Sequence, residues 1–151
     1  MWLTETCRWV RNENVTERKY YAVVEGIPAK AEGTITSYLA ENKAFKVYAT
    51  TQENGKEAIL EYKTLKTNRD YALLEIGLET GRKNQIRTQL ESIKHPIAGD
   101  KKYGAQTNPV GRVALHAGTI AFVHPETGAE MSFTLPLPFK FHALFDKKTR
   151  P

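Results

Sequence analysis

The sequence has a single cysteine, Cys7, among its 151 residues. One cysteine forms no disulfide framework and no cysteine-rich metal site. The simplest interpretation of Cys7 is a small, buried or half-buried thiol, because a nucleophilic cysteine needs a paired base to activate it. This sparse use of cysteine also favours a reducing compartment, so the cytoplasm is the expected location.

Long hydrophobic runs are also missing. No apolar stretch approaches the roughly 20 residues of a transmembrane helix, and the polar start MWLTETCRWVRNE differs from a secretory signal. The sequence contains no internal repeat, low-complexity tract or linker. With 40 % hydrophobic and 26 % charged residues it has the composition of an ordinary globular protein, and we expect one domain over residues 1–151.

Several patterns of known chemistry are absent. The spacing of His95, His116 and His124 matches no metal site, so structural roles are favoured for them. No Ser-His-Asp arrangement and no phosphate-binding GxxxxGK[ST] loop is present. The charge is mildly basic, with 22 Lys and Arg against 17 Asp and Glu, which permits a polyanionic partner without requiring one.

Hydrophobic alternation predicts an α+β domain built on a mostly antiparallel, mixed sheet with a few helices. Ala72, Leu74, Ile76 and Leu78 recur at every second position, which indicates a strand with one face toward a core. The expected strands are 18–26, 33–40 (weaker), 57–65, 71–78, 112–124 and 130–136, with hairpin turns at TNRD (67–70) and PETG (125–128).

A change of period then predicts a helix. Ile86, Leu90 and Ile93 recur at i, i+4 and i+7, the pattern of an amphipathic helix. Pro96 biases the residue before it away from the helical region, so the helix is expected to end there. Residues 139–145 are expected to form a short closing helix.

The start of the first helix is basic. Gly81 lets the backbone approach a ligand closely, and Arg82, Lys83 and Arg87 add full charges to the unpaired N–H groups of a helix N-terminus. Arg can hold a phosphate or carboxylate through two parallel hydrogen bonds. Two interpretations stay open: an anion-binding site, or a solvated helix start whose cations oppose the helix dipole.

Three segments of the sequence resemble the RluA-type RNA pseudouridine synthases. The similarity runs from about residue 15 to residue 140, and the departures are small, since Asn84 and Gln89 replace histidines and Arg18 replaces a lysine. TGRKNQIRTQLESIKHPIAGDKKYG (80–104) is similar to the family segment TGRxHQIRxHLxxxGHPxxGDxxYG, RKYYAVVEG (18–26) to KxYxAxVxG, and LHAGTIAFVHPETGAEMSFTLPLP (115–138) to LHAxxLxFxHPxTGExxxFxAPLP.

This resemblance implies the fold of the C-terminal half of the family's catalytic domain and a reaction without metal or cofactor. Such enzymes flip a uridine out of structured RNA, detach its base, turn it and rejoin it through carbon. Tyr20 would lie against the target base, and Arg87 would pair with the catalytic aspartate and keep it ionised. Arg82 would face RNA phosphate with Lys83 beside it, and Leu115 would line the pocket. The same residues also permit plainer roles, such as a strand aromatic or a surface ion pair.

The family's catalytic aspartate is missing from its expected place. It belongs to an HRLDxxTSG segment that precedes the KxYxA strand, and none of residues 1–19 is an aspartate. The chain has only Asp70, Asp100 and Asp146, and Asp100 matches a family turn residue that is interpreted as structural. We therefore expect this chain alone to make no pseudouridine, whether it is a part of a longer protein or a truncated relative.

Three functions stay open at this point. The chain is favoured as part of a pseudouridine synthase that acts on ribosomal or transfer RNA, with its aspartate outside these residues. An alternative is a non-catalytic RNA-binding module, which would bind RNA in a salt-dependent way through the basic helix start. A further alternative is an assembly fragment without a role in RNA.

The resemblance to half of a domain also predicts self-association. The family's sheet runs through both halves, so a lone half is expected to expose a sheet edge and apolar surface. We predict oligomers or strand exchange between copies at high protein concentration. Size-exclusion chromatography that shows a compact monomer at every concentration would contradict this.

Overall fold

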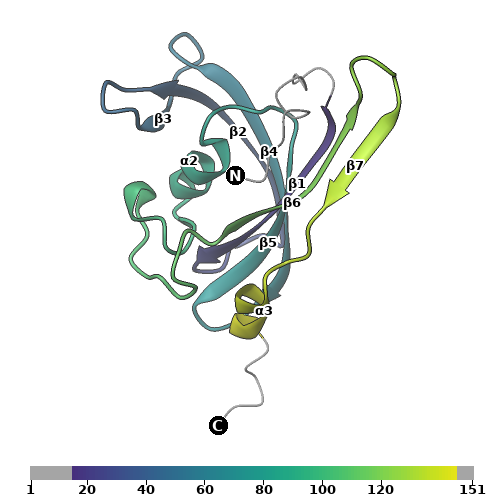
Figure 1. The fold of residues 1–151 in the computed structure, drawn as a ribbon. Coiled ribbons are helices and arrows are strands. Elements are labelled where there is room, and N and C mark those ends of the chain that lie inside the picture. Colours follow the sequence, from purple (N-terminus) through teal and green to yellow (C-terminus); the bar gives the residue numbers. More distant parts are fainter. Residues whose placement is uncertain (1–14, 146–151) are drawn as a thin grey trace.

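The structure, a computed structural model, describes residues 15–145. Cys7 and Asp146 lie outside the described residues. The described chain forms one seven-stranded sheet in the order β3-β2-β4-β5-β1-β6-β7, and each neighbouring pair of strands is antiparallel (Figure 1). The predicted α+β class with a mostly antiparallel sheet is therefore confirmed.

The six expected strands and both expected helices are present. The bounds of 71–78 and 139–145 are as expected, and the ends of the other elements are shifted. Two elements were missed: the short strand β3 and the one-turn 3-10 helix η2. In chain order the elements are β1 (Val15–Glu25), β2 (Glu32–Glu41), β3 (Val47–Thr50), β4 (Lys56–Thr67), β5 (Tyr71–Leu78), α2 (Gln85–Ser92), η2 (Lys101–Tyr103), β6 (Leu115–Val123), β7 (Glu130–Thr134) and α3 (Phe139–Phe145).

The hairpin of β4 and β5 illustrates how local chemistry sets the topology. Asn68 closes the turn, because its side-chain oxygen accepts hydrogen bonds from the backbone N–H groups of Asp70 (2.8 Å) and Tyr71 (2.7 Å). The prediction of a single buried face for β5 was incomplete. Leu73, on the other face, is only 2 % exposed, so elements cover both sides of the sheet at this point.

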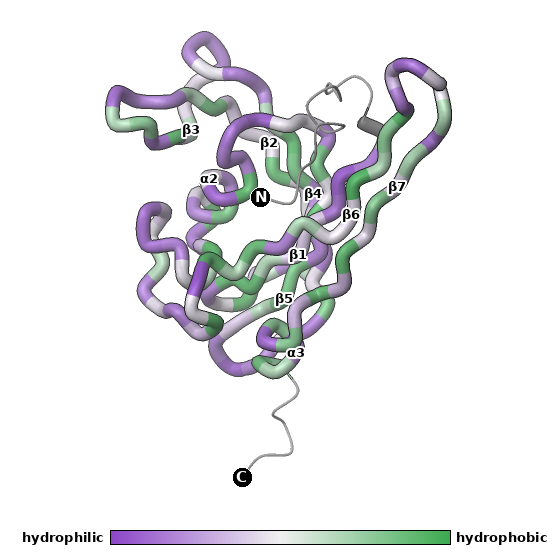
Figure 2. The backbone as a smooth tube through the Cα atoms, in the orientation of Figure 1, coloured by the Kyte–Doolittle hydropathy of each residue, from purple (hydrophilic) through white to green (hydrophobic). Residues whose placement is uncertain are grey.

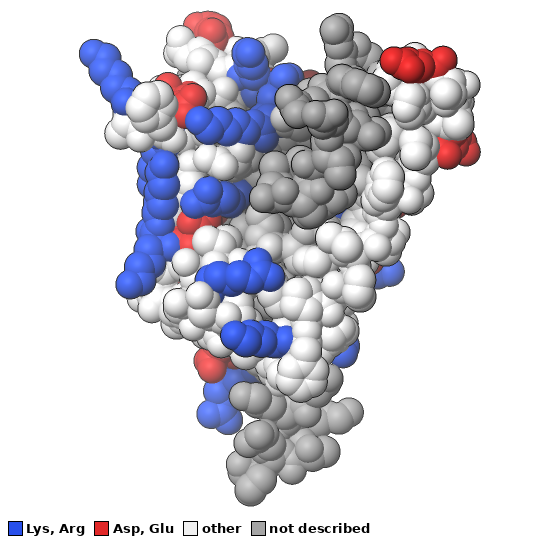
Figure 3. All heavy atoms as spheres, viewed as in Figure 1, with Lys and Arg blue, Asp and Glu red and all other residues white. Residues whose placement is uncertain are grey.

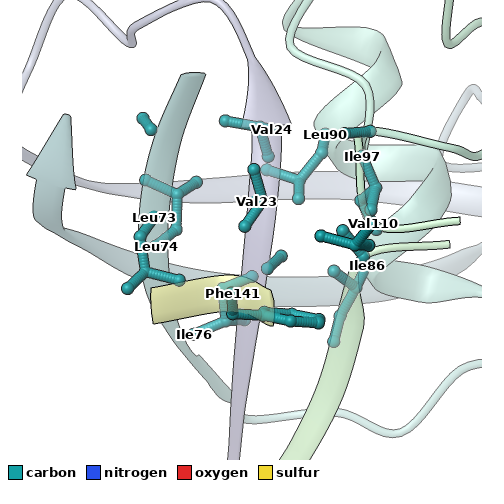
Figure 4. Packing of buried hydrophobic residues seen from close by; sticks show 14 of the residues in the cluster. Val23, Val24, Leu73, Leu74, Ile76, Ile86, Leu90, Ile97, Val110 and Phe141 are labelled. Atoms are coloured by element: carbon teal, nitrogen blue, oxygen red, sulfur yellow. The ribbon is translucent and has the colours of Figure 1, made fainter. Parts of the chain in front are cut away.

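The main core forms where the central strands meet α2 and α3. Leu90 of α2, Val24 of β1, Leu74 of β5 and Phe141 of α3 all belong to one buried cluster (Figure 4). Hydrophobic residues concentrate in these central strands, whereas the turns near β3 are hydrophilic (Figure 2). The core therefore anchors α2 to the sheet and leaves the β3 side of the molecule polar.

Helix α2 ends at Ser92, before the proline that the sequence identified as a stop. Lys94 follows in the left-handed region with a φ of 68°, and its backbone N–H donates to the carbonyl of Glu91 at 2.9 Å. The carbonyl of Pro96 then accepts a hydrogen bond from the backbone N–H of Glu25 at 2.9 Å. The segment after the helix is thus fastened to the end of β1.

The outer strands of the sheet are β3 and β7. Phe133 on β7 is 40 % exposed and stacks on Phe122, with ring centroids 5.9 Å apart. Self-association through such an edge stays a prediction. Within residues 15–145, none of the helices has the length and apolar character needed to cross a bilayer.

Two glycines with positive φ provide a test of the packing that supports the loop after α2. Gly99 (φ 84°) and Gly111 (φ 79°) share the backbone conformation that disfavours other residues, but a Cβ on Gly99 would overlap the Arg112 carbonyl, whereas one on Gly111 meets nothing. We predict that Gly111→Ala lowers the free energy of unfolding by about 1–2 kcal/mol. Gly99→Ala should lower it by about 1–3 kcal/mol more, because of the overlap. Urea unfolding measures both, and equal losses would contradict the packing described.

Candidate functional site

The loop that leads into α2 is fixed by a buried glutamine. Gln85 is 2 % exposed, and its side-chain oxygen accepts hydrogen bonds from the Thr80 hydroxyl (2.8 Å) and the Arg82 backbone N–H (3.1 Å). Its amide nitrogen donates to the Ile59 carbonyl on β4 at 3.0 Å. Asn84 precedes the helix in the left-handed region with a φ of 52°. The basic residues of this loop are therefore presented on a rigid support.

Arg82 and Lys83 are exposed and line a pocket of about 580 Å³ between this loop, β2 and the start of β4. The Arg82 Nε donates to the Glu57 carbonyl at 2.8 Å, and the Lys83 ammonium lies 2.6 Å from a carboxylate oxygen of Glu41. Lys56 also lines the pocket. Arg82 and Lys83 have local partners but remain at the surface, where an anion can reach them.

Figure 3 shows where positive charge gathers on this face of the molecule. Lys and Arg side chains lie along the side that carries β3 and α2, and few lie over the hairpin of β6 and β7. The basic helix start is thus part of a broader positive surface and not an isolated cluster. A surface of this kind attracts polyanions over a distance, to an extent that depends on salt.

Arg87 forms an ion pair with Asp100 in the candidate site. Its Nε donates to Oδ2 of Asp100 at 2.7 Å and its Nη2 to Oδ1 at 2.8 Å, a bidentate pair. The Asp100 side chain is only 1 % exposed and the Arg87 side chain 25 %. The hydrogen bonds with Asp100 raise the pKa of Arg87, against the lowering effect of burial. The interpretation of Asp100 as a turn residue was incomplete, because it is also the ion-pair partner of Arg87.

Tyr103 joins this ion pair to the edge of the sheet. Its ring is completely buried and lies under the Arg87 guanidinium, 4.6 Å from the ring centroid. Its hydroxyl accepts a hydrogen bond from the Val47 backbone N–H of β3 at 3.0 Å. The side-chain amide of Asn84 donates to the same hydroxyl at 3.4 Å. One aromatic side chain therefore positions α2, η2 and β3 relative to one another.

Tyr20 and Leu115 lie on one face of the sheet. Leu115 is directly opposite Ala22, which is two residues from Tyr20 on β1, so the three side chains project to the same side. The neighbouring His116 projects to the other side, where its ring lies 6.4 Å from that of Phe141. Burial raises the pKa of the Tyr20 phenol, while the charge of Arg18 lowers it. The Tyr20 side chain is half-buried.

The predicted site residues fall into three groups in the structure. Tyr20 and Leu115 share a sheet face, Arg82 and Lys83 share the pocket, and Arg87 pairs with Asp100. Sequence reasoning missed the roles of Asp100 and Tyr103. The only signal was that both belong to the GDKKYG part of the family-like segment, which by itself indicates a turn.

The histidines have the structural contacts expected of them. His95 Nδ1 lies 3.0 Å from the Glu25 carbonyl, and His116 Nε2 lies 3.2 Å from the Leu135 carbonyl. His124 Nδ1 accepts a hydrogen bond from the Glu126 backbone N–H at 3.1 Å. Among residues 15–145, His, Cys, Asp and Glu side chains form no group of three that could hold a metal ion.

Comparison with known proteins gives consistent matches. The family model described as RNA pseudouridylate synthase matches residues 3–92. The Bacillus subtilis protein named uncharacterized RNA pseudouridine synthase YlyB is 41 % identical over 128 residues, which cover 84 % of this chain and 42 % of that protein. The ribosomal large subunit pseudouridine synthase D of Haemophilus influenzae is 32 % identical over 157 residues, covering 95 % of this chain and 48 % of that protein.

A solved structure agrees with the fold. Human RNA pseudouridylate synthase domain containing 1 has a TM-score of 0.75 at 22 % sequence identity, over 89 % of this chain and 59 % of that one. At this identity the likeness supports the fold and not a shared substrate. The chain spans about half the length of the curated relatives it matches.

The buried ion pair leads to a prediction about stability. Arg87→Ala leaves the buried Asp100 carboxylate without its cation, so we predict a loss of about 3–5 kcal/mol in the free energy of unfolding. Replacing both partners, Arg87→Met with Asp100→Leu, should cost less than Arg87→Ala alone, because no charge is left buried. The exposed Arg69 is the matched control, and Arg69→Ala should change stability by less than about 0.5 kcal/mol. Equal free energies of unfolding for Arg87→Ala and Arg69→Ala, measured with urea, would contradict this prediction.

Proposed function

The chain belongs to the RNA pseudouridylate synthase family, and from this we propose that its function is the isomerisation of uridine to pseudouridine in RNA. The observation that carries the proposal is the placement of Arg87, which lies in the QIR of the family-like segment and is held by Asp100 and Tyr103. A guanidinium fixed in this way is pre-organised to stabilise a second, catalytic carboxylate in its ionised form.

The geometry of the guanidinium supports this role. The edge formed by Nε and Nη2 is filled by Asp100, whereas Nη1 makes only a long contact of 3.4 Å with Oδ1 of Asn84. Arg has five N–H donors, so it can hold a second acceptor on the remaining edge. We propose that the catalytic carboxylate binds there, with Asp100 acting to orient Arg87.

The residues on the sheet are proposed to receive the base. A uridine flipped out of structured RNA loses its stacking partners, and an aromatic face restores part of that contact. Tyr20 would supply this face, and Leu115, on the same side of the sheet, would line the pocket. Arg82 and Lys83 would contact phosphates of the RNA. Such contacts release the counterions bound to the phosphates, so the affinity depends on salt.

The carboxylate itself is proposed to come from outside residues 1–151. Asp100 is 1 % exposed, and both its oxygens accept hydrogen bonds from Arg87, so it is unsuited to attack a base or sugar. Asp70 is exposed in the turn between β4 and β5, and Asp146 lies outside the described residues. An HRLD-like segment supplied by other polypeptide would complete the site, and these residues alone would form no pseudouridine.

Ribosomal RNA is the first substrate to test, and transfer RNA the second. The Haemophilus influenzae relative is named for the large ribosomal subunit. We place this activity in the cytoplasm, in line with the sparse use of cysteine.

We predict that the 151-residue chain yields no pseudouridine on unmodified ribosomal or transfer RNA. The same chain, preceded by a segment that carries the HRLDxxTSG motif expected of the family, should yield it. In that longer protein, Arg87→Ala should slow the reaction by about 10²–10³-fold, because it removes a pre-organised donor. Arg69→Ala, in an exposed turn, should leave the rate unchanged. Pseudouridine is measured by mass spectrometry of digested RNA.

Two outcomes would contradict the proposal in different ways. Pseudouridine made by the 151 residues alone would show that a carboxylate within the chain serves. A longer protein that is folded by circular dichroism and binds RNA, but forms no product, would remove the support for catalysis. The chain would then be better described as a non-catalytic RNA-binding module.

A further inference from the structure

The tight turn between β2 and β3 presents an aromatic side chain to solvent. Phe45 is 68 % exposed, although large hydrophobic residues usually lie in the interior. It adopts a φ of 62°, in the left-handed region that residues other than glycine rarely occupy. Backbone strain of this kind is found most often at binding sites and functional loops. The turn therefore carries two unusual features at one residue.

Asn42 connects the two ends of this turn through hydrogen bonds. Its side-chain oxygen accepts hydrogen bonds from the backbone N–H groups of Ala44 and Lys46, both at 2.9 Å. Its own backbone N–H donates to the Lys46 carbonyl at 2.9 Å, and its carbonyl accepts from the Phe45 N–H at 3.0 Å. Phe45 is thus projected by a hydrogen-bonded tip and not by a loose loop, which reduces the entropy lost when a ligand binds.

Four lysines lie on the turn or contact it, and we name Phe45 with Lys43, Lys46, Lys83 and Lys102 the Phe45 surface. The Lys83 ammonium lies 5.9 Å from the centroid of the Phe45 ring, and the Lys102 ammonium donates to the Phe45 carbonyl at 3.3 Å. Lys43 and Lys46 flank the ring in the sequence. The side of the molecule that carries β3 and α2 is also where Lys and Arg side chains gather in Figure 3.

Acidic residues only partly offset this charge. Glu41 lies 2.6 Å from the Lys83 ammonium, and Glu91 lies 3.9 Å from that of Lys46. Lys46 also faces the buried ring of Tyr103, at 5.2 Å from its centroid. The Phe45 surface therefore keeps a positive balance around one exposed apolar ring.

The Phe45 surface is continuous with the pocket beside α2. Lys83 belongs to both, since it contacts the Phe45 ring and lines the pocket together with Arg82 and Glu41. A strand of RNA bound to Arg82 and Lys83 would therefore have the turn that carries Phe45 beside it. The exposed ring lies next to the site already proposed for RNA phosphates.

We propose that the Phe45 surface binds an unpaired nucleotide of the RNA substrate, with its base stacked on Phe45 and the adjoining phosphates contacted by the lysines. This rests on the proposed function, which makes RNA the partner. An aromatic ring among cations is the arrangement that binds single-stranded nucleic acid without sequence preference. A base inside a duplex keeps its faces covered, so the ring selects a loop, bulge or strand end.

The composition of the surface favours RNA over a protein partner. Protein interfaces have hydrophobic centres in which Lys is depleted, and stable ones bury well over ~1,000 Å². A single exposed phenyl ring with lysines beside it provides neither the apolar area nor the composition. Phosphates, in contrast, match the lysines in charge, and each base offers a flat face of suitable size.

The test measures binding of the 151-residue chain to a fluorescein-labelled, uridine-rich single-stranded RNA and to the duplex formed with its complement. Fluorescence anisotropy is recorded at several salt concentrations. We expect Phe45→Ala to weaken binding of the single strand by about tenfold, with the same salt dependence, because it removes one stacked base. Phe45→Trp should retain the affinity, and the duplex should be insensitive to either change.

Two controls separate stacking from other effects. Phe139→Ala removes an even more exposed ring, 81 % exposed, from α3 at the far end of the molecule from β3, and should leave affinity unchanged (Figure 1). Lys43→Ala should instead reduce the slope of log affinity against log salt by about 0.7, the value for one phosphate contact on a single strand. Circular dichroism checks that each variant is folded. If Phe45→Ala does not fold, the comparison of Phe45→Trp with the wild type still tests the inference.

Each contrary result has a definite meaning. Equal affinity of the wild type, Phe45→Ala and Phe45→Trp for the single-stranded RNA would overturn the inference. If Arg82→Ala weakens binding in that case, the proposed function still stands. Equal losses for Phe45→Ala and Phe139→Ala would also overturn it, as a non-specific effect. Absence of RNA binding by the wild-type chain would overturn the proposed role of the Phe45 surface. The proposed catalysis is tested separately, by pseudouridine formation in the longer protein.

Discussion

The buried carboxylate of Asp100 is the constraint around which the candidate site is built. At 1 % exposure it cannot be solvated by water, and Arg87 supplies both of its charge-assisted hydrogen bonds. The pair joins α2 to the loop after it, and the Tyr103 ring packs against the Arg87 guanidinium. Arg87 is consequently held by the fold itself, before any substrate is present. An arginine fixed in this way loses little conformational entropy when it binds a second anion.

Polar side chains inside the protein place the loop that leads to this arginine. Gln85 connects Thr80 and Arg82 to the Ile59 carbonyl of β4, and Gln89, completely buried, donates to the carbonyls of Ile35 and Ala58. These bonds replace water for backbone groups of the sheet that α2 covers. They explain why two glutamines occupy the buried side of an amphipathic helix. The helix is therefore fixed to the sheet by directional bonds as well as by apolar contact.

The sequence allowed the long, periodic elements to be predicted, because their spacing follows from burial of one side. The alternation around Leu74 and the helical spacing of Ile86 and Leu90 gave a strand and a helix at the correct places. Strand β3 was missed since its four residues, Val47–Thr50, are too few to show a period. It is held by long-range contacts, including the hydrogen bond from Val47 to Tyr103, which no local pattern reveals.

The site was predictable only in part for the same reason. The family resemblance indicated Arg87 and Asp100 as separate residues, but their pairing depends on how the loop after α2 returns to the helix. Lys94 shows that residue type alone does not predict the backbone conformation. It adopts a φ of 68° at the position where the family segment TGRxHQIRxHLxxxGHPxxGDxxYG has glycine, so the backbone conformation is kept although the residue that favours it is absent. Backbone shape here is determined by the surrounding contacts.

Tyr103 gives the two proposed roles of the chain a common support. Its ring lies under the guanidinium of Arg87, and its hydroxyl binds the backbone N–H of Val47, two residues after Phe45. The turn that presents Phe45 and the arginine proposed for catalysis are thus fastened to the same buried side chain. A nucleotide stacked on Phe45 would be held in a fixed position relative to Arg87, without a flexible segment between them. Binding energy from a part of the RNA that does not react would in this way contribute to orienting the part that does.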